Sequence, residues 1–305
     1  MADTHLHLPL GSCSDGVDPI VVTPESAGWD YCGLRVAHLA GGDARQVATD
    51  DCELAVVPLV GSVTLEVNGQ TIELKGRDSV FARISDWAYI PIGAELTLQS
   101  AQGAEIALAT ARAERRHEVV YIPSHAVPWE IRGAGAATRQ IVNFMAPSAF
   151  DGADRLMCVE VMTPDGNWSS YPPHKHDDSP DSLAENEEIY YFRLGKTGST
   201  GTSDEGFAFH RTYTSDGSID TTVVVRDEDV FLVPRGYHGP TVAAPGYPLY
   251  YLNVMAGPNA TRTMAIVDDS AHAWIRGSWT SQVWDPRCPL IVADPPGAQA
   301  SSLQL

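Results

Sequence analysis

Residues 171–195 read YPPHKHDDSPDSLAENEEIYYFRLG, which joins a His-x-His pair to an apolar, aromatic run. Successive side chains of a β-strand point to opposite faces, so His174 and His176 are expected on one face. Glu188 follows after a polar turn, and residues 189–194 have the composition of a strand. Two imidazoles and a carboxylate on neighbouring strands can bind one metal ion, and we predict such a site here.

A second stretch, residues 229–238, reads DVFLVPRGYH and adds one more imidazole. It is an apolar strand that ends in a Pro/Gly turn, after which His238 is presented. Three nitrogens and one oxygen leave coordination positions open for water or substrate, which distinguishes a catalytic metal site from a closed structural one. The predicted metal ligands are therefore His174, His176, Glu188 and His238.

The rest of the chain predicts an all-β fold. Residues 63–74 alternate apolar and polar positions around Asn68-Gly69, a strong hairpin signal. Residues 221–225 and 229–233 give two more strands that are separated by a charged turn. Long amphipathic helical patterns are scarce, so a sandwich or barrel architecture is expected.

The two halves of the chain resemble a degenerate repeat. Residues 78–95 parallel residues 229–238, and Glu95 stands where the later half has a histidine. No histidine occurs between His38 and His117, so the first barrel is predicted to lack a comparable metal site. The expected organisation is an N-terminal barrel without metal, a C-terminal metal-binding barrel, and a C-terminal extension with a disordered tail: residues 1–150, 151–275 and 276–305.

These motifs resemble those of the cupin superfamily. Its first motif ends in His-x-His and a Glu that six residues separate from a Gly, as in Glu188 and Gly195. Its second motif places a His shortly after Pro-x-Gly, as in Pro234, Gly236 and His238. Two intervals depart from the family pattern. The spacer from His176 to Glu188 is longer than is usual in the family, and the spacer from Gly236 to His238 is one residue shorter. The resemblance implies a bicupin, with two tandem β-barrel (jelly-roll) domains.

Longer strings resemble one family more closely, the 5-deoxy-glucuronate isomerases of bacterial myo-inositol catabolism. They are GAGAATRQ at 133–140, VPRGYH at 233–238 and LYYLNVMAG at 249–257. These isomerases are bicupins related to the uronate ketol-isomerases of pectin breakdown. Where typical members carry Gln, this chain has His210, so no family role is transferred to that position.

The resemblance implies conversion of 5-deoxy-D-glucuronate to 5-dehydro-2-deoxy-D-gluconate, with a divalent metal acting as a Lewis acid. Zinc is favoured because this chemistry is not redox chemistry, although manganese, iron or nickel would accept the same ligands. Isomerisation is redox-neutral and needs no nicotinamide or flavin. The chain does not choose between proton transfer through an enediol and a hydride shift.

The formal net charge of −19 argues against nucleic-acid or anionic-membrane partners, which would need a basic surface. A small anionic uronate substrate must therefore be bound by local cations. Lys175, Arg211 and Arg235 lie beside the metal motifs, and Arg235 or Arg211 is the favoured carboxylate partner. Alternation should turn one tyrosine of each adjacent pair inward, and Tyr251 is the candidate to transfer a proton.

Composition suits a cytoplasmic enzyme, because five widely spaced cysteines indicate no disulfide framework and no apolar stretch is long enough to span a bilayer. Assembly into a homo-oligomer stays open. Two other functions also stay open. A metal-dependent dioxygenase would consume oxygen, whereas in a non-catalytic sugar-binding bicupin, alanine at Glu188 or His238 would leave the physiological activity unchanged.

Overall fold

The computed structural model describes residues 6–294, and β-strands dominate it. Nine strands form the sheet of the first barrel, which confirms the all-β prediction for this half of the chain. The long strand β5 pairs with four others and connects the two ends of this sheet. The nine strands are β2 (Ile20–Val22), β3 (Cys32–Leu39), β4 (Ala44–Ala48), β5 (Cys52–Val67), β6 (Gln70–Arg77), β7 (Trp87–Ile90), β8 (Glu95–Gln99), β9 (Ala104–Arg112) and β10 (Val120–Ile122).

The second barrel consists of two sheets that face each other. One has seven strands in the order β1-β19-β16-β21-β13-β12-β11: β1 (His7–Leu8), β11 (Trp129–Arg132), β12 (Arg139–Val142), β13 (Met157–Thr163), β16 (Glu187–Leu194), β19 (Val230–Val233) and β21 (Leu249–Ala256). The other has six: β14 (Trp168–Ser169), β15 (His174–Lys175), β17 (Ala208–Tyr213), β18 (Asp220–Val225), β20 (Tyr237–Ala243) and β22 (Val267–Asp268).

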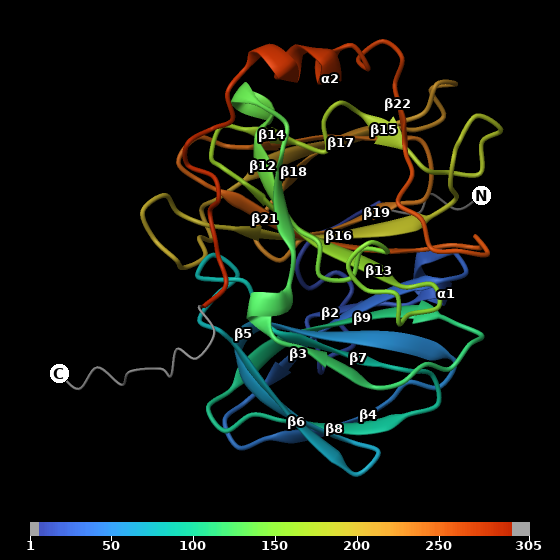
Figure 1. Ribbon diagram of the computed structural model, residues 1–305, viewed down its shortest axis with the longest axis vertical. Coiled ribbons are helices and arrows are strands. Elements are labelled where there is room, and N and C mark those ends of the chain that lie inside the picture. The colour runs from blue at the N-terminus through green and yellow to red at the C-terminus, as the bar shows by residue number, and fades with distance from the viewer. Residues whose placement is uncertain (1–5, 295–305) are drawn as a thin grey trace.

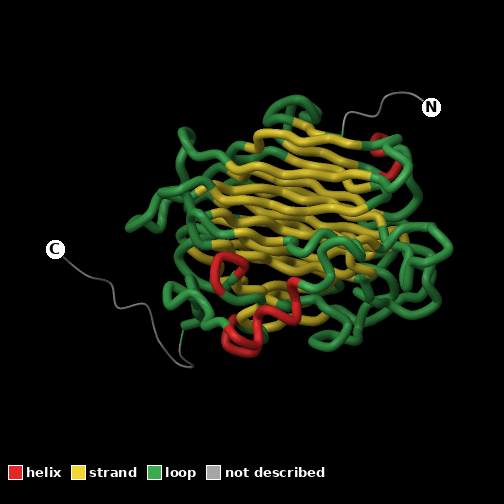
Figure 2. The backbone as a smooth tube through the Cα atoms, turned by 90° about the horizontal axis from the view of Figure 1, so that it is seen from above, coloured by secondary structure: helices red, strands yellow, loops and turns green. Residues whose placement is uncertain are grey.

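Helical segments are short and lie at the edges of the barrels (Figure 2). In Figure 1 the label α2 lies above the second barrel, beyond β14, β17 and β15. The α-helices are α1 (Pro24–Ala27) and α2 (Ile275–Ser278), and the 3-10 helices are η1 (Ser124–Ala126), η2 (Gly135–Ala137) and η3 (Trp279–Ser281). No helix in residues 6–294 is long and apolar enough to cross a membrane.

Three hydrophobic clusters occupy the spaces between the stacked sheets seen in Figure 1. One lies inside the first barrel, one between the barrels and one inside the second barrel. Strand β16 contributes to two of them, because Tyr190 and Phe192 enter the second barrel while Ile189 and Tyr191 pack between the barrels. Because of this alternation, β16 packs into the core of the second barrel with one face and into the cluster between the barrels with the other.

The predicted hairpin at residues 63–74 is confirmed. Strands β5 and β6 pair from Val63↔Leu74 to Val67↔Gln70, and the turn residues Asn68 and Gly69 both have positive φ. That geometry is the one that Asn-Gly favours in two-residue hairpins. The strands predicted at 221–225 and 229–233 also form, as β18 and β19, but they belong to different sheets.

Strands on both sides of the expected boundary at residue 150 belong to one sheet. Strands β11 and β12 precede that boundary, yet β12 pairs with β13 in the second barrel. Strand β1 also crosses over and pairs with β19. These pairings join residues far apart in the chain, so local sequence patterns do not reveal them. The tail predicted to be disordered falls mostly outside the described residues.

Candidate functional site

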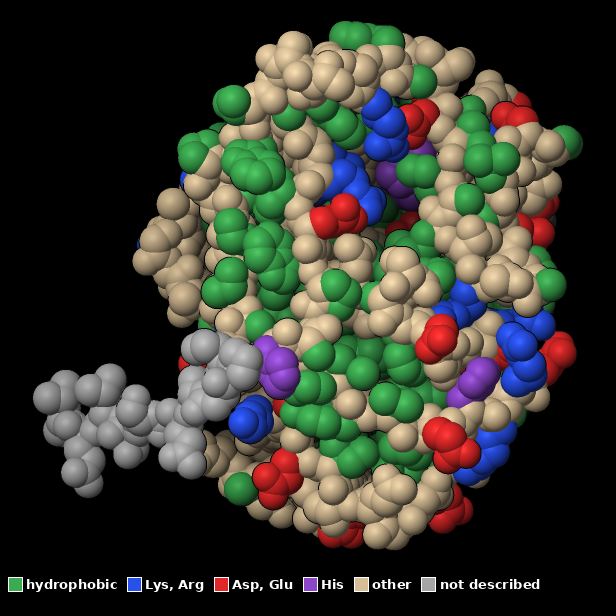
Figure 3. Space-filling model, in the orientation of Figure 1, with side chains coloured by type: hydrophobic (Ala, Val, Ile, Leu, Met, Phe, Trp, Pro, Cys, Tyr) green, Lys and Arg blue, Asp and Glu red, His purple; other side chains and the backbone are tan. Residues whose placement is uncertain are grey.

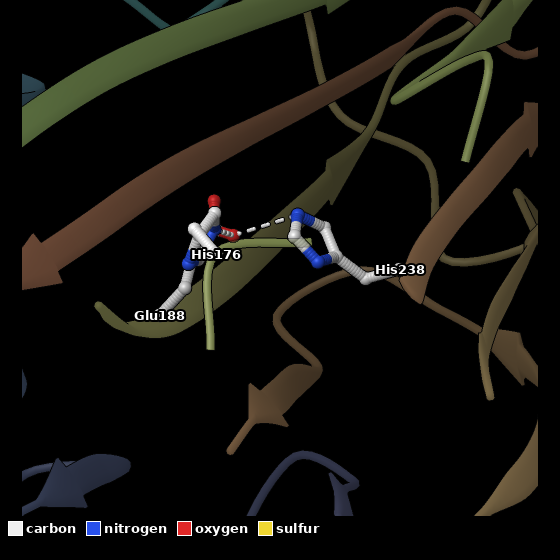
Figure 4. A group of neighbouring side chains, drawn as sticks. All are labelled: His176, Glu188 and His238. Carbon is white, nitrogen blue, oxygen red and sulfur yellow. Dashed lines mark hydrogen bonds and ion pairs between the residues drawn. The ribbon is translucent and has the colours of Figure 1, made fainter. Parts of the chain in front are cut away.

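Three of the four predicted metal ligands converge inside the second barrel (Figure 4). His176 directly follows β15, Glu188 lies in β16 and His238 lies in β20, and one ligand atom of each lies within 4.8 Å of the others. The Nε2 atoms of His176 and His238 are 3.0 and 3.1 Å from Oε2 of Glu188. All three side chains are buried. Strands from both sheets thus bring the ligands to one point.

Neighbouring polar groups orient two of these ligands. Nδ1 of His176 lies 2.9 Å from the carbonyl oxygen of Asn186 and donates to it, which turns Nε2 toward Glu188. Asn253 donates from Nδ2 to Oε1 of Glu188 at 2.5 Å, so the second carboxylate oxygen is also held. Burial raises the pKa of Glu188, but His238 and His176 outweigh it and hold that pKa well below its usual range. The carboxylate is therefore ionised.

The fourth predicted ligand, His174, lies beside this group but is not part of it. Its ring centroid is 4.6 Å from that of His238, which is its partner in the β15–β20 pairing. Nδ1 of His174 is 2.9 Å from the carbonyl oxygen of Pro172, so Nε2 is again the free nitrogen. Burial lowers the pKa of His174 well below its usual value, which keeps the imidazole neutral.

The donor set fits a divalent metal ion. Two ligand atoms each about 2.0–2.2 Å from an ion lie roughly 3 Å apart, which matches the separations at Glu188. Nδ1 of buried His238 has no hydrogen-bond partner within residues 6–294, and its Nε2 faces Oε2 of Glu188, as expected of a nitrogen that is available to a metal. Imidazoles with one carboxylate accept zinc, manganese, iron or nickel.

A cavity of about 400 Å³ opens beside the ligands, a volume within the usual range for small-molecule sites. Glu188, Tyr190 and Tyr251 line it, and so do His174 and His176. Figure 3 shows that histidine, acidic and basic side chains meet in a hollow in the upper half of the molecule. The structure therefore brings the predicted Tyr251 together with the predicted metal ligands.

Hydroxyl groups form a short series along the cavity wall. The hydroxyl of Tyr190 lies 2.8 Å from Oγ of Ser170, and that of Tyr251 lies 3.4 Å from the same atom. Burial raises the pKa of Tyr251, so its hydroxyl stays protonated at neutral pH. Tyr251 can therefore donate a hydrogen bond to an oxygen in the cavity.

The cations predicted from sequence neighbourhood do not line this cavity. Lys175 points away from the two neighbouring histidines, as alternation requires, and its Nζ donates to Asp181 at 2.7 Å. Arg211 donates to Asp220 at 3.0 Å, and Arg235 donates to Ser218 at 3.0 Å. Lys175 is buried against its carboxylate partner, whereas the side chains of Arg211 and Arg235 reach solvent from β17 and from the turn before β20.

Sequence reasoning missed the arginines that do line the cavity: Arg132, Arg139, Arg262 and Arg276. Two lie on β11 and β12, which were assigned to the other domain, and the others lie near the C-terminal extension. Proximity in the chain to the histidine motifs could not reveal them. Arg139 does belong to the string GAGAATRQ, which was the available signal.

His210 and the interior of the first barrel do not take part in the candidate metal site. His210 lies in the second barrel but bonds to Thr241 at 2.8 Å, and burial lowers its pKa to about 3. It is therefore a neutral core residue. Among the described residues, aliphatic side chains such as Leu54, Leu65 and Ile106 fill the interior of the first barrel, and Glu95 is exposed.

Comparison with known proteins assigns the family. The KduI/IolB family model matches residues 9–275. The 5-deoxy-glucuronate isomerase of Geobacillus kaustophilus is 39% identical over 280 residues, covering 90% of this chain and 96% of that protein. The enzyme of the same name from Bacillus subtilis strain 168 is 38% identical over 259 residues, which cover 83% of this chain and 91% of that protein.

Solved structures agree with this assignment. The crystal structure of an IolB-like protein from Salmonella typhimurium matches with a TM-score of 0.80 and 32% identity, covering 89% of this chain and 99% of that one. Oxalate decarboxylase from Bacillus subtilis matches with a TM-score of 0.55 and 14% identity, covering 81% and 74%, which supports the fold alone. This chain belongs to the KduI/IolB family.

Proposed function

We propose that this protein is an aldose–ketose isomerase that converts 5-deoxy-D-glucuronate to 5-dehydro-2-deoxy-D-gluconate. The observation that carries the proposal is the convergence of His176, Glu188 and His238 beside a sugar-sized cavity, in a chain 39% identical to a 5-deoxy-glucuronate isomerase. The dioxygenase and the non-catalytic alternatives receive no comparable support from the relatives. The implied partner is a small anionic sugar, and five unpaired cysteines suit a reducing cytoplasm.

A divalent metal is proposed to be held by His176, Glu188 and His238, with His174 as the fourth ligand. When bound, the metal would act as a Lewis acid that polarises the aldehyde carbonyl of the substrate. Zinc is favoured for this role because the reaction needs no change in metal oxidation state, and manganese, iron and nickel suit the same ligands. The backbone carbonyls behind His174 and His176 keep Nε2 of both rings available.

The protein's own groups contribute orientation and proton placement. Asn253 fixes the carboxylate of Glu188, so the ligand set is preorganised before substrate enters. We propose that Tyr251 donates a hydrogen bond from its hydroxyl to the reacting oxygen of the sugar, because its raised pKa keeps the proton in place. Ser170 and Tyr190 extend that hydroxyl series and can pass a proton along it.

Metal analysis of the purified protein, followed by an anaerobic assay with 5-deoxy-D-glucuronate, tests this function. We expect about one divalent ion per protein chain, full turnover without oxygen, and loss of activity after chelation. In deuterated water, solvent deuterium in the product would indicate proton transfer through an enediol, and retained hydrogen would indicate a hydride shift. No conversion of this substrate, or turnover that requires dissolved oxygen, would refute the proposal.

A further inference from the structure

Arg139 differs from the other buried arginines of the protein. Within residues 6–294 three arginines are buried, namely Arg77, Arg139 and Arg193. Arg77 pairs with Glu160, and Arg193 pairs with Glu105 and with another carboxylate. Arg139 is only 3% exposed, yet no carboxylate in the described part of the chain pairs with it. A buried charge is costly unless it is paired, so this guanidinium is suited to an anion that the protein itself does not supply.

The contacts of Arg139 position its guanidinium without neutralising it. Nη1 donates to the carbonyl oxygen of Ala137 at 3.0 Å, and Nη2 donates to that of Tyr171 at 3.2 Å. The ring of Trp279 lies 5.5 Å from the guanidinium carbon. An arginine has five N–H donors, and Nε of Arg139 has no hydrogen-bond partner. Burial lowers the pKa of Arg139 to about 10, so it still carries its charge at neutral pH.

The direction of β12 points Arg139 into the cavity. Arg139, Ile141 and Asn143 occupy alternate positions and all three line the cavity, whereas Gln140 on the opposite face bonds to the backbone of Ile291. Tyr251 lines the same cavity, together with His174, His176 and Glu188. A single small molecule can therefore contact Arg139 and the metal group together.

The other arginines of the cavity are already engaged. Arg132 forms an ion pair with Glu130. Arg276 donates to both oxygens of Asp268, at 2.5 and 2.7 Å. Arg262 donates to three backbone carbonyls, those of Met145, Phe150 and Leu156. Arg262 is only half-buried, so among the arginines that line the cavity Arg139 is the fully buried one, and its Nε has no hydrogen-bond partner within residues 6–294.

We propose that Arg139 binds the carboxylate of the sugar-acid substrate and thereby sets the preference for uronates over neutral sugars. The planar guanidinium presents parallel N–H donors that match a carboxylate. The aldehyde end of the same molecule then faces the metal ligands, since an aldose acid carries its two reactive groups at opposite ends. This inference rests on the proposed isomerase function, and it replaces Arg211 and Arg235 as the carboxylate partner.

Steady-state kinetics of Arg139→Gln test the assignment, with Arg226→Gln as the control. Arg226 is exposed, so its variant removes the same charge from the surface. We expect Arg139→Gln to raise KM for 5-deoxy-D-glucuronate about 10- to 100-fold, with a smaller change in kcat and an unchanged metal content. Arg139→Lys keeps the positive charge but loses the planar pair of N–H donors. We therefore expect its KM to lie between those of the wild type and Arg139→Gln, and its folding to be less disturbed than that of Arg139→Gln.

The analogue 5-deoxy-D-glucose, in which CH₂OH replaces the carboxylate, separates recognition from structure. We expect Arg139→Gln and Arg139→Lys to lower the acid-to-neutral ratio of kcat/KM, with little loss on the neutral sugar. Equal losses on both sugars, or a KM within about twofold of the Arg226→Gln control, would overturn the inference. Failure of the wild-type protein to convert the acid would instead refute the proposed isomerase function.

Discussion

At the scale of single residues, the adjacent carboxylates Glu187 and Glu188 have different roles because β16 turns them to opposite faces. Glu188 faces the histidines, whereas Glu187 accepts hydrogen bonds from the backbone amides of Asp30, Tyr31 and Cys32 in the first barrel. One side chain belongs to the candidate metal centre and the other fastens the two barrels together. Family spacing to Gly195 favours Glu188 as the ligand, and the structure groups Glu188 with His176 and His238.

Substitution of these two residues should therefore separate metal binding from stability. We expect Glu188→Gln to lower the bound metal by at least tenfold, because an amide oxygen is a weaker ligand than a carboxylate. Glu187→Gln should instead reduce the free energy of unfolding by about 1–3 kcal/mol, since three amides lose a charged acceptor. Metal analysis and denaturant titration of both variants provide the check. Loss of metal from Glu187→Gln alone would contradict this division.

At the scale of elements, the start of β20 must approach the segment before β15 closely. Gly239 follows His238 and has φ of +88°, and a Cβ there would lie 1.8 Å from the carbonyl oxygen of Ser170. Only glycine permits this approach, so the residue after the ligand is fixed by its neighbour on another strand. The strand that carries His238 thereby packs against Ser170, which lines the cavity.

Gly239→Ala and Gly246→Ala form a matched pair that measures this effect. Both glycines have φ of +88°, but a Cβ at Gly246 would meet nothing within 4 Å. We expect Gly246→Ala to cost about 1–2 kcal/mol from backbone strain alone. Gly239→Ala should cost about 3 kcal/mol more and should lower metal content, because relief of the clash moves His238. Equal melting temperatures for the two variants would refute this explanation.

At the scale of the whole molecule, the largest hydrophobic cluster joins the two barrels. It contains Leu34 and Trp87 from the first barrel together with Tyr191 and Tyr250 from the second. Trp87 packs edge-on against Phe144, with ring centroids 5.3 Å apart. Because each barrel uses this shared layer as part of its own core, neither is expected to unfold alone.

Calorimetry should therefore show one unfolding transition for the intact chain. We expect Trp87→Ala to destabilise it by about 3–5 kcal/mol and to lower the single melting temperature, since a large buried ring is lost. Trp284→Ala is the control, because Trp284 is 60% exposed, and it should leave the transition nearly unchanged. Two separate transitions, of which Trp87→Ala moves only one, would contradict a shared core.

The sequence by itself determined the strands, the inward tyrosines and the metal-ligand motif, because each follows from alternation over a few neighbouring residues. Glu188 with His176 and the hairpin at Asn68-Gly69 are of this kind. Tertiary structure alone decided that β12 joins the second barrel, and hence that Arg139 lines the cavity instead of Arg211. Those outcomes depend on pairing between strands distant in the chain, which no local periodicity encodes.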